Sequence, residues 1–286
     1  MGRPKKSLGQ HFLVNRGVAE KILTLAGLPR GHTPSIQNQD NETFVEVGPG
    51  HGILTKPLAE RAQHVLAIEI DASLVTALQN RLGTYSNLQI IHADALSFDY
   101  AKIPGKIAVV ANLPYNISTP LLFQFLDLRK KVTRLTLMFQ KELADRITAS
   151  PGTKAYGQLS VVTQLFTETK MGFAVPPTAF IPPPKVNSAV ICLQVRSEPK
   201  ISVGNESYFR DIVRQAFAYR RKTLLGALCQ GGLDKQDVIN ALSMSQISPT
   251  RRAETLAIEE FAALTRAFAT VPTSRNLPLH RREKLS

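Results

Sequence analysis

A chain of 286 residues is long enough for one large domain with its own core and a smaller second domain. No run approaches the ~20 apolar residues of a membrane-spanning helix, and two cysteines are too few for a disulfide framework or a zinc cluster, so we expect a cytoplasmic protein without a metal site. The formal net charge of +13 favours a polyphosphate partner such as nucleic acid, and a charge that only maintains solubility is the alternative.

Short apolar runs alternate with amphipathic stretches from residue 43 to residue 140. The amphipathic stretches, such as ILTKPLAERA and ASLVTALQNRL, have the spacing of helices. Unbroken apolar strands separated by helices are typical of a parallel sheet that is covered on both faces. We therefore predict a doubly wound α/β domain. Its expected strands are TFVEV (43–47), HVLAIEI (64–70), LQIIHAD (88–94), IAVVAN (107–112) and LTLMFQ (135–140).

The rest of the chain divides into a strand pair and a helical region. TKMGFAV (169–175) and SAVICLQV (188–195) have no helical pattern between them and predict a hairpin, whose loop PPTAFIPPPKVN is stiffened by prolines. From residue 206 onward the pattern is helical and ends in a basic tail, which we expect to be disordered. The predicted domains are residues 1–197 and 206–286. The polar segment 29–42 predicts a surface loop.

A glycine-rich turn follows the first strand of the sheet. The residues Glu46-Val47-Gly48-Pro49-Gly50-His51-Gly52 allow the backbone to approach a ligand closely. The G-x-G-x-G spacing differs from the G-x-G-x-x-G of dinucleotide sites and resembles motif I of S-adenosylmethionine (SAM)-dependent methyltransferases. A turn of this kind also occurs by chance.

Each of the next two predicted strands has an acidic residue near its carboxyl end. Glu69 stands about twenty residues after the glycines, where doubly wound folds place a carboxylate for ribose hydroxyls, and a capping or ion-paired role is the alternative. Asp94 ends the third strand and could accept a hydrogen bond from an adenine amine. Since the carboxyl ends of parallel strands form the ligand-binding edge of such a sheet, the three features predict one cofactor site.

The fourth strand ends in Asn112-Leu113-Pro114-Tyr115 at the same edge. The Asn112 side-chain carbonyl and the backbone carbonyl of Leu113 or Pro114 can accept the two N–H groups of an adenine amine and aim its lone pair at a methyl donor. Tyr115 can stack on the purine. Ser118-Thr119-Pro120 predicts a helix N-cap directly after this loop. A simple strand-to-helix turn is the alternative.

Together with further segments, these motifs give the chain a resemblance to the ribosomal RNA adenine N6-dimethyltransferases of the KsgA/RsmA type over about 90% of its length. The segments that carry the resemblance are LGQHFL (8–13), EVGPG, IEID, ADAL, NLPYNIST, QKE, KAYGQLSV, FIPPPKVNSAV and AFAYRRKTL, of which NLPY and PPPKV are specific. The resemblance implies a Rossmann-like SAM-methyltransferase sheet, mostly parallel with a C-terminal hairpin strand pair, and a small all-helical domain.

The resemblance also implies roles for single residues. Tyr115 and Phe180 would sandwich the target base. His11, which stands where many relatives have Asn, is among the residues that would contact SAM. The complete expected cofactor set is His11, Leu13, Gly48, Gly50, Glu69, Asp94 and Asn112. The implied partner is 16S rRNA in the small ribosomal subunit or its precursor, and the protein is expected to act as a monomer.

Basic residues of the helical region supply candidate RNA contacts. On one continuous helix through YFRDIVRQAFAYRRKTLL, Arg210, Arg214 and Arg221 would share an arc of roughly 40°, and Lys222 follows them. A solvated helix face is the alternative reading of this pattern.

The main interpretation is an enzyme that dimethylates N6 of two adjacent adenosines near the 3′ end of 16S rRNA. The alternatives are a 23S rRNA adenine methylase of the resistance type, and a largely non-catalytic RNA-binding factor in ribosome assembly. A DNA-adenine or protein-glutamine methyltransferase could use a similar loop after the fourth strand, but the FIPPPKV segment argues against both.

Overall fold

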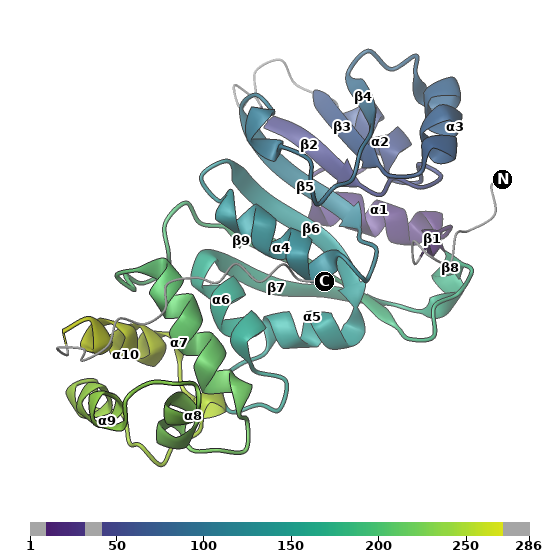
Figure 1. Cartoon of the computed structure of the whole chain (residues 1–286). Coiled ribbons are helices and arrows are strands. Elements are labelled where there is room, and N and C mark those ends of the chain that lie inside the picture. The colour runs from purple at the N-terminus through teal and green to yellow at the C-terminus, as the bar shows by residue number, and fades with distance from the viewer. Residues whose placement is uncertain (1–9, 32–41, 271–286) are drawn as a thin grey trace. The chain divides into compact units, whose positions relative to one another are not determined.

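The computed structural model describes residues 10–31 and 42–270 (Figure 1). The chain forms two compact units, of which unit 1 comprises residues 1–148 and 166–198 and unit 2 comprises residues 149–165 and 199–286. Residues 149–165, which the sequence analysis placed in the first domain, thus belong to unit 2. Most of the predicted loop 29–42 and the predicted basic tail lie outside the described residues.

Within the described residues, a seven-stranded sheet forms the centre of unit 1. Its strand order is β4-β3-β2-β5-β6-β9-β7. The five strands from β4 to β6 pair in parallel, and β9 is antiparallel to both β6 and β7. The predicted doubly wound, mostly parallel sheet with a C-terminal hairpin is confirmed. The strands are β2 (Glu42–Val47), β3 (His64–Glu69), β4 (Leu88–His92), β5 (Lys106–Asn112), β6 (Val132–Gln140), β7 (Thr167–Val175) and β9 (Ser188–Val195).

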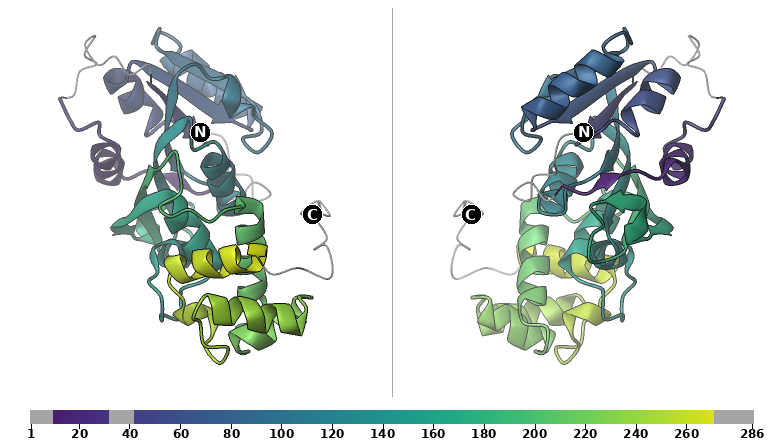
Figure 2. Two further views of the ribbon diagram at one scale, coloured as in Figure 1. Left: turned by 90° about the vertical axis from the view of Figure 1, so that its left-hand side faces the viewer. Right: turned by 90° about the vertical axis from the view of Figure 1, so that its right-hand side faces the viewer.

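Helices cover both faces of this sheet (Figures 1 and 2). The connections run from β2 toward β4 through α2 (Thr55–Arg61) and α3 (Ala72–Leu82), and from β5 to β6 through α4 (Ser118–Asp127). Because parallel crossovers are right-handed, helices of connections that run in opposite directions lie on opposite faces. The change of direction between β2 and β5 therefore leaves their carboxyl ends open to a ligand.

An N-terminal strand and helix that the sequence analysis did not predict pack on one face. β1 (Phe12–Leu13) pairs antiparallel with β8 (Phe180–Ile181), which lies in the proline-rich loop between β7 and β9. The Asn15 side chain caps α1 (Arg16–Leu25) by accepting the Val18 N–H. Buried side chains of α1, α2 and the sheet form one apolar cluster. This packing brings the N-terminal segment beside the proline-rich loop.

Unit 2 is helical. Its helices are α6 (Gln158–Phe166, whose last residue falls in unit 1), α7 (Glu206–Ala218), α8 (Leu224–Gln230), α9 (Lys235–Met244) and α10 (Ile258–Thr270); unit 1 also holds α5 (Lys141–Thr148). Side chains of Asn205, Thr223 and Asp234 cap α7, α8 and α9. No helix among the described residues is both long and apolar enough to cross a membrane.

The continuous helix that was predicted from Tyr208 onward is wrong beyond Ala218. Tyr219 has φ −124° and ψ 68°, which is not helical, and Thr223 then caps a separate helix. Arg221 lies in the intervening turn and does not share a helical arc with Arg210 and Arg214. A single periodic pattern across two helices misled the sequence analysis, because the polar stretch between them fits a solvated helix face as well as a turn.

Candidate functional site

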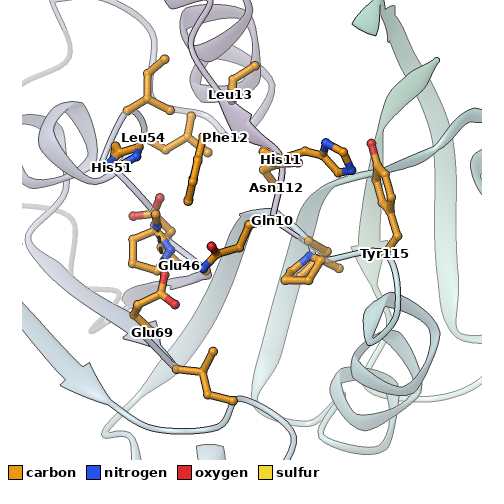
Figure 3. Close-up of a pocket in the computed structure, with 17 residues that line it drawn as sticks. Gln10, His11, Phe12, Leu13, Glu46, His51, Leu54, Glu69, Asn112 and Tyr115 are labelled. Carbon is orange, nitrogen blue, oxygen red and sulfur yellow. Dashed lines mark hydrogen bonds between the residues drawn. The ribbon is translucent and has the colours of Figure 1, made fainter. Parts of the chain in front are cut away.

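A pocket lies at the carboxyl edge of the parallel strands of unit 1 (Figure 3). The N-terminal segment, the glycine turn after β2, the end of β3 and the loop after β5 contribute its walls. Nine predicted site residues line it together: His11, Leu13, Gly48, Gly50, Glu69, Asn112, Leu113, Pro114 and Tyr115. The strand ends thus bring together segments that are up to about one hundred residues apart in the sequence.

The glycine turn requires glycine at defined positions. Gly48 has φ +66° and Gly50 has φ +55°, in the left-handed region that other residues enter only with strain. A Cβ atom on Gly50 would lie 2.8 Å from Cδ1 of Phe12, so the N-terminal segment closes against the bare backbone. Any side chain at position 50 would push the segment that carries His11 away from the pocket.

Glu69 anchors the turn from the neighbouring strand. Its Oε2 accepts the Gly50 N–H at 3.1 Å, and its Oε1 accepts the Asp71 N–H at 3.0 Å. The side chain is 4% exposed, and burial raises its pKa while the backbone hydrogen bonds oppose that shift. Because each carboxylate oxygen has a second lone pair, Glu69 can also accept hydroxyl donors from a ligand in the pocket.

A second buried carboxyl group lies in the same pocket, and sequence reasoning did not predict it as a site residue. Glu46 of β2 is 2% exposed, and its Oε2 has no hydrogen-bond partner among the described residues. Burial raises its pKa to about 8, and repulsion by Glu69 contributes to this shift. The nearby Thr55 hydroxyl lowers the pKa, although its geometry falls short of a hydrogen bond. The available signal was an acidic residue inside an apolar strand.

The loop after β5 holds its polar atoms in fixed positions. The Asn112 Nδ2 donates to the His11 carbonyl at 3.1 Å, which leaves Asn112 Oδ1 available as an acceptor. The Pro114 carbonyl accepts the Ile117 N–H at 3.2 Å. Ser118 is not the predicted N-cap: it is the first residue of α4, and its hydroxyl donates to the Tyr115 carbonyl at 2.9 Å. The hydroxyl therefore ties the helix to the loop from inside the first turn.

Tyr115 presents its ring to the pocket and is fixed at its hydroxyl. The hydroxyl lies 2.8 Å from the Ser188 hydroxyl, and burial raises its pKa. The His11 ring faces it with a centroid separation of 5.8 Å and a tilt of 30° (Figure 3). His11 Nδ1 donates to the Pro182 carbonyl at 2.8 Å. The N-terminal segment thus connects the loop after β5 with the proline-rich loop.

Two predicted site residues do not line the pocket. Asp94 is exposed, and its Oδ1 accepts the Leu96 N–H at 2.9 Å. Phe180 is 2% exposed and belongs to the apolar cluster, where its position in β8 is opposite Leu13. Gln10 and His51, which sequence reasoning passed over, do line it. The sequence feature that could have identified them is their position: Gln10 precedes His11, and His51 stands within the glycine turn.

The basic residues predicted to contact RNA lie in unit 2. Arg214 is exposed on α7 and donates to Asp211 Oδ1 at 3.1 Å, and Arg210 is half-buried on the same helix. Arg221 and Lys222 are exposed in the turn before α8. The last two are therefore accessible without breaking any helix.

Comparisons with known proteins agree on one family. A family model described as ribosomal RNA adenine dimethylase matches residues 1–270. The ribosomal RNA small subunit methyltransferase A of Alkaliphilus oremlandii (strain OhILAs) is 43% identical over 272 residues, which cover 92% of this chain and 91% of the relative. The crystal structure of a dimethyladenosine transferase from Plasmodium falciparum is 27% identical with a TM-score of 0.73, covering 91% of this chain and 98% of that one. The crystal structure of the 23S rRNA methyltransferase ErmE is 25% identical with a TM-score of 0.69, covering 90% of this chain and 99% of that one.

Proposed function

The chain belongs to the ribosomal RNA adenine dimethylase family, and from this membership we propose that it transfers methyl groups from SAM to N6 of two adjacent adenosines near the 3′ end of 16S rRNA. The observation that carries the proposal is the shared pocket of Asn112 and Glu69. An acceptor for an adenine amine and a carboxylate for ribose hydroxyls lie around one cavity, as a methyl transfer between two bound nucleosides requires.

The residues of the pocket fit the proposed cofactor. The backbone of the glycine turn offers a close approach without side chains, since Gly48 and Gly50 are left-handed. Glu69 would accept the ribose hydroxyls, and His11, Leu13 and Asn112 would contact the rest of the molecule. SAM supplies an electrophilic methyl group when it is bound. Contact between Asp94 and the adenine amine remains part of the proposal, and it requires a cofactor that reaches past the present pocket wall.

The protein's contribution to the transfer is alignment of the target amine. Asn112 Oδ1 would accept one N–H, because its Nδ2 is held by the His11 carbonyl. The Pro114 carbonyl already accepts the Ile117 N–H, which favours the Leu113 carbonyl as the second acceptor. Two acceptors turn the amine lone pair out of conjugation with the ring and toward the methyl group, which is the geometry that displacement needs.

Stacking would hold the target base in the pocket. The Tyr115 ring is fixed by Ser188 and supplies one face. For Phe180 to supply the other face, its ring, which is 2% exposed, has to leave the apolar cluster when RNA binds. The base itself must leave its own helix stack before its amine can enter a pocket of this kind.

Substrate choice is assigned to the basic residues of unit 2. Arg210, Arg214, Arg221 and Lys222 would contact RNA phosphates in a particle or its precursor, with the protein acting as a monomer. In the proposal, substrate choice belongs to the predicted domain 206–286 and chemistry to the pocket of unit 1, while residues 149–165 of the predicted domain 1–197 belong to unit 2. The 43% identity to a small-subunit methyltransferase, compared with 25% to the 23S enzyme ErmE, supports 16S rRNA as the substrate.

The test is a comparison of substrates with one matched variant. The protein is incubated with labelled SAM and, separately, with small-subunit particles, large-subunit particles, DNA and free RNA, and the modified base is identified by mass spectrometry. We expect N6-dimethyladenosine in small-subunit particles and a loss of at least about 100-fold in rate with Asn112→Ala. Modification of large-subunit particles would instead support the resistance-type alternative. Particle binding without any methylation would support the assembly factor.

A further inference from the structure

A second cavity of unit 1 lies where β6 ends and β9 begins, and the proposed function assigns it no task. Its volume is about 380 Å³, which falls in the range of about 300 to 1,000 Å³ that is usual for ligand pockets. Two segments that carried the family resemblance meet in its wall, namely QKE (140–142) and the KVN (185–187) of the proline-rich loop, and Pro177 completes the wall. We call this cavity the β6–β9 pocket.

The β6–β9 pocket adjoins the site proposed for the target base. Gln140, at the end of β6, pairs with Ser188, the first residue of β9. The next residue of the wall is tied to the same place, because the Lys141 N–H donates to the Asn187 carbonyl at 2.9 Å. The Ser188 hydroxyl lies 2.8 Å from the Tyr115 hydroxyl. One step along the chain, from Asn187 to Ser188, therefore separates the wall of this pocket from the residue that fixes the stacking ring.

The polar groups of the β6–β9 pocket fit a nucleobase that carries an exocyclic amine. The side chains of Gln140 and Glu142 line the cavity and have no hydrogen-bond partner among the described residues. A glutamine amide can pair with N6 and N7 of adenine, and a carboxylate can accept a hydrogen from an amine. Val186, which is 46% exposed, and Pro177 supply apolar surface for a ring. The pocket thus offers partners for both the edge and the face of a base.

The charges around the β6–β9 pocket argue against a site for phosphate alone. Lys141 Nζ lies 2.7 Å from Asp145 Oδ2, so this cation already has a partner. Lys185 is exposed and forms no ion pair within the described part of the chain, and it can therefore approach one phosphate. The Glu142 carboxylate would repel any further phosphate. One available cation beside hydrogen-bonding and apolar groups suits a single nucleotide better than a run of backbone phosphates.

We propose that the β6–β9 pocket binds the nucleotide next to the target adenosine on the RNA strand, and that Gln140 recognises its base. This inference rests on the proposed function, because it presumes that an adenosine occupies the site beside Tyr115. RNA sequence is read mainly from unstacked bases, and the neighbour of a base that has left its stack is exposed in the same way. Since the strand crosses the protein in one direction, the pocket holds the other adenosine of the pair for only one of the two targets. That target is the one the pocket favours.

Small-subunit particles with one altered base test this recognition. Purine riboside lacks the exocyclic amine of adenosine and cannot be methylated at N6, so it is placed at each of the two adjacent positions in turn. Single-turnover reactions with labelled SAM, at protein concentrations below saturation, give the rate of the first methyl transfer to the remaining adenosine. The reference is the same adenosine in unaltered particles. With the wild-type protein, the substitution should lower this rate about tenfold in one arrangement, as the loss of a base-specific pair does, and little in the other.

Gln140→Ala is the critical variant. In the sensitive arrangement it should methylate unaltered particles about tenfold more slowly than the wild type, and purine riboside should cause little further loss, because the contact is already gone. Lys185→Ala should slow the reaction of altered and unaltered particles equally, because a phosphate contact does not depend on the base. Gln79→Ala, at an exposed position on α3, is the matched control and should keep the wild-type difference.

The outcomes separate this inference from the proposed function. If purine riboside changes neither rate with the wild type, or if Gln140→Ala keeps the full difference between the two kinds of particle, the inference is wrong while the proposed function stands. The wild-type comparison needs no variant and so does not depend on the folding of Gln140→Ala. If unaltered particles are not methylated at all, the proposed function itself is wrong, and this inference falls with it.

Discussion

Replacing Glu46 with glutamine should change how the stability of the ligand-free protein depends on pH. Burial and the neighbouring Glu69 raise the pKa of this carboxyl group from 4.5 to about 8. Between those pH values the folded protein holds a proton that the unfolded chain has released. The free energy of unfolding of the wild type must therefore receive a contribution that decreases as pH rises through this window.

The size of the effect follows from the shift. One pKa unit corresponds to about 1.4 kcal/mol, so from pH 5 to pH 8 this group should lower the unfolding free energy by about 3 kcal/mol. Glutamine does not titrate, and Glu46→Gln should gain that amount relative to the wild type over the same range. Ion-paired carboxyl groups with lowered pKa values, such as Glu20 and Glu260, act equally in both proteins and cancel in the comparison.

Urea unfolding followed by circular dichroism at pH 5, 6, 7 and 8 gives the comparison. Glu60→Gln, at an exposed position on α2, is the control. The difference between its free energy of unfolding and that of the wild type should vary little with pH. A difference between Glu46→Gln and the wild type that stays constant from pH 5 to pH 8 would mean that Glu46 is ionised in the folded protein. The physical argument from its burial would then be refuted.

Three further variants test the other parts of the site. Glu69→Ala should weaken SAM binding by about 1 to 3 kcal/mol in calorimetry, because a buried charged acceptor is lost; unchanged affinity in a folded variant would remove Glu69 from the cofactor site. Charge reversal at Arg221 and Lys222 should weaken binding to small-subunit particles most at low salt and leave SAM affinity unchanged; binding equal to the wild type across salt concentrations would make them solvated residues. Phe180→Ala should lower the unfolding free energy by about 3 to 5 kcal/mol, because its ring is buried in the apolar cluster; an unaltered ratio of mono- to dimethyladenosine in single-turnover reactions would leave it packing as its only role.

The sheet could be predicted from the sequence because buried parallel strands are continuous apolar runs. The start of β6 lacks such a continuous apolar run and was therefore not predicted. The strand begins at Val132, three residues before the predicted run, and includes Thr133 and Arg134. Arg134 fits there because its Nη2 lies 2.6 Å from Glu42 Oε2 on another strand, and because its guanidinium lies over the Phe44 ring. Contacts of this kind depend on the folded arrangement and leave no periodic pattern.

The candidate site divides in the same way. Residues at strand ends, such as Glu69 and Asn112, could be assigned to one edge because parallel topology brings those ends together. The pairing of β1 with β8 could not be predicted, because each strand has only two residues and they are more than 160 positions apart. That pairing buries the ring of Phe180. A phenylalanine in a proline-rich loop did not by itself indicate this burial.

The backbone and the side chain of His11 make different contacts, which the residue type at position 11 does not distinguish. The His11 carbonyl, a backbone atom, accepts the Asn112 Nδ2 and thereby directs Asn112 Oδ1 to the position proposed for the target amine. The His11 side chain instead donates to the Pro182 carbonyl and faces Tyr115. Orientation of Asn112 therefore depends on the path of β1, which pairs with β8 and closes against Gly50, and not on which side chain stands at position 11. An asparagine there would keep the carbonyl in place and alter only the side-chain contacts with the Pro182 carbonyl and the Tyr115 ring.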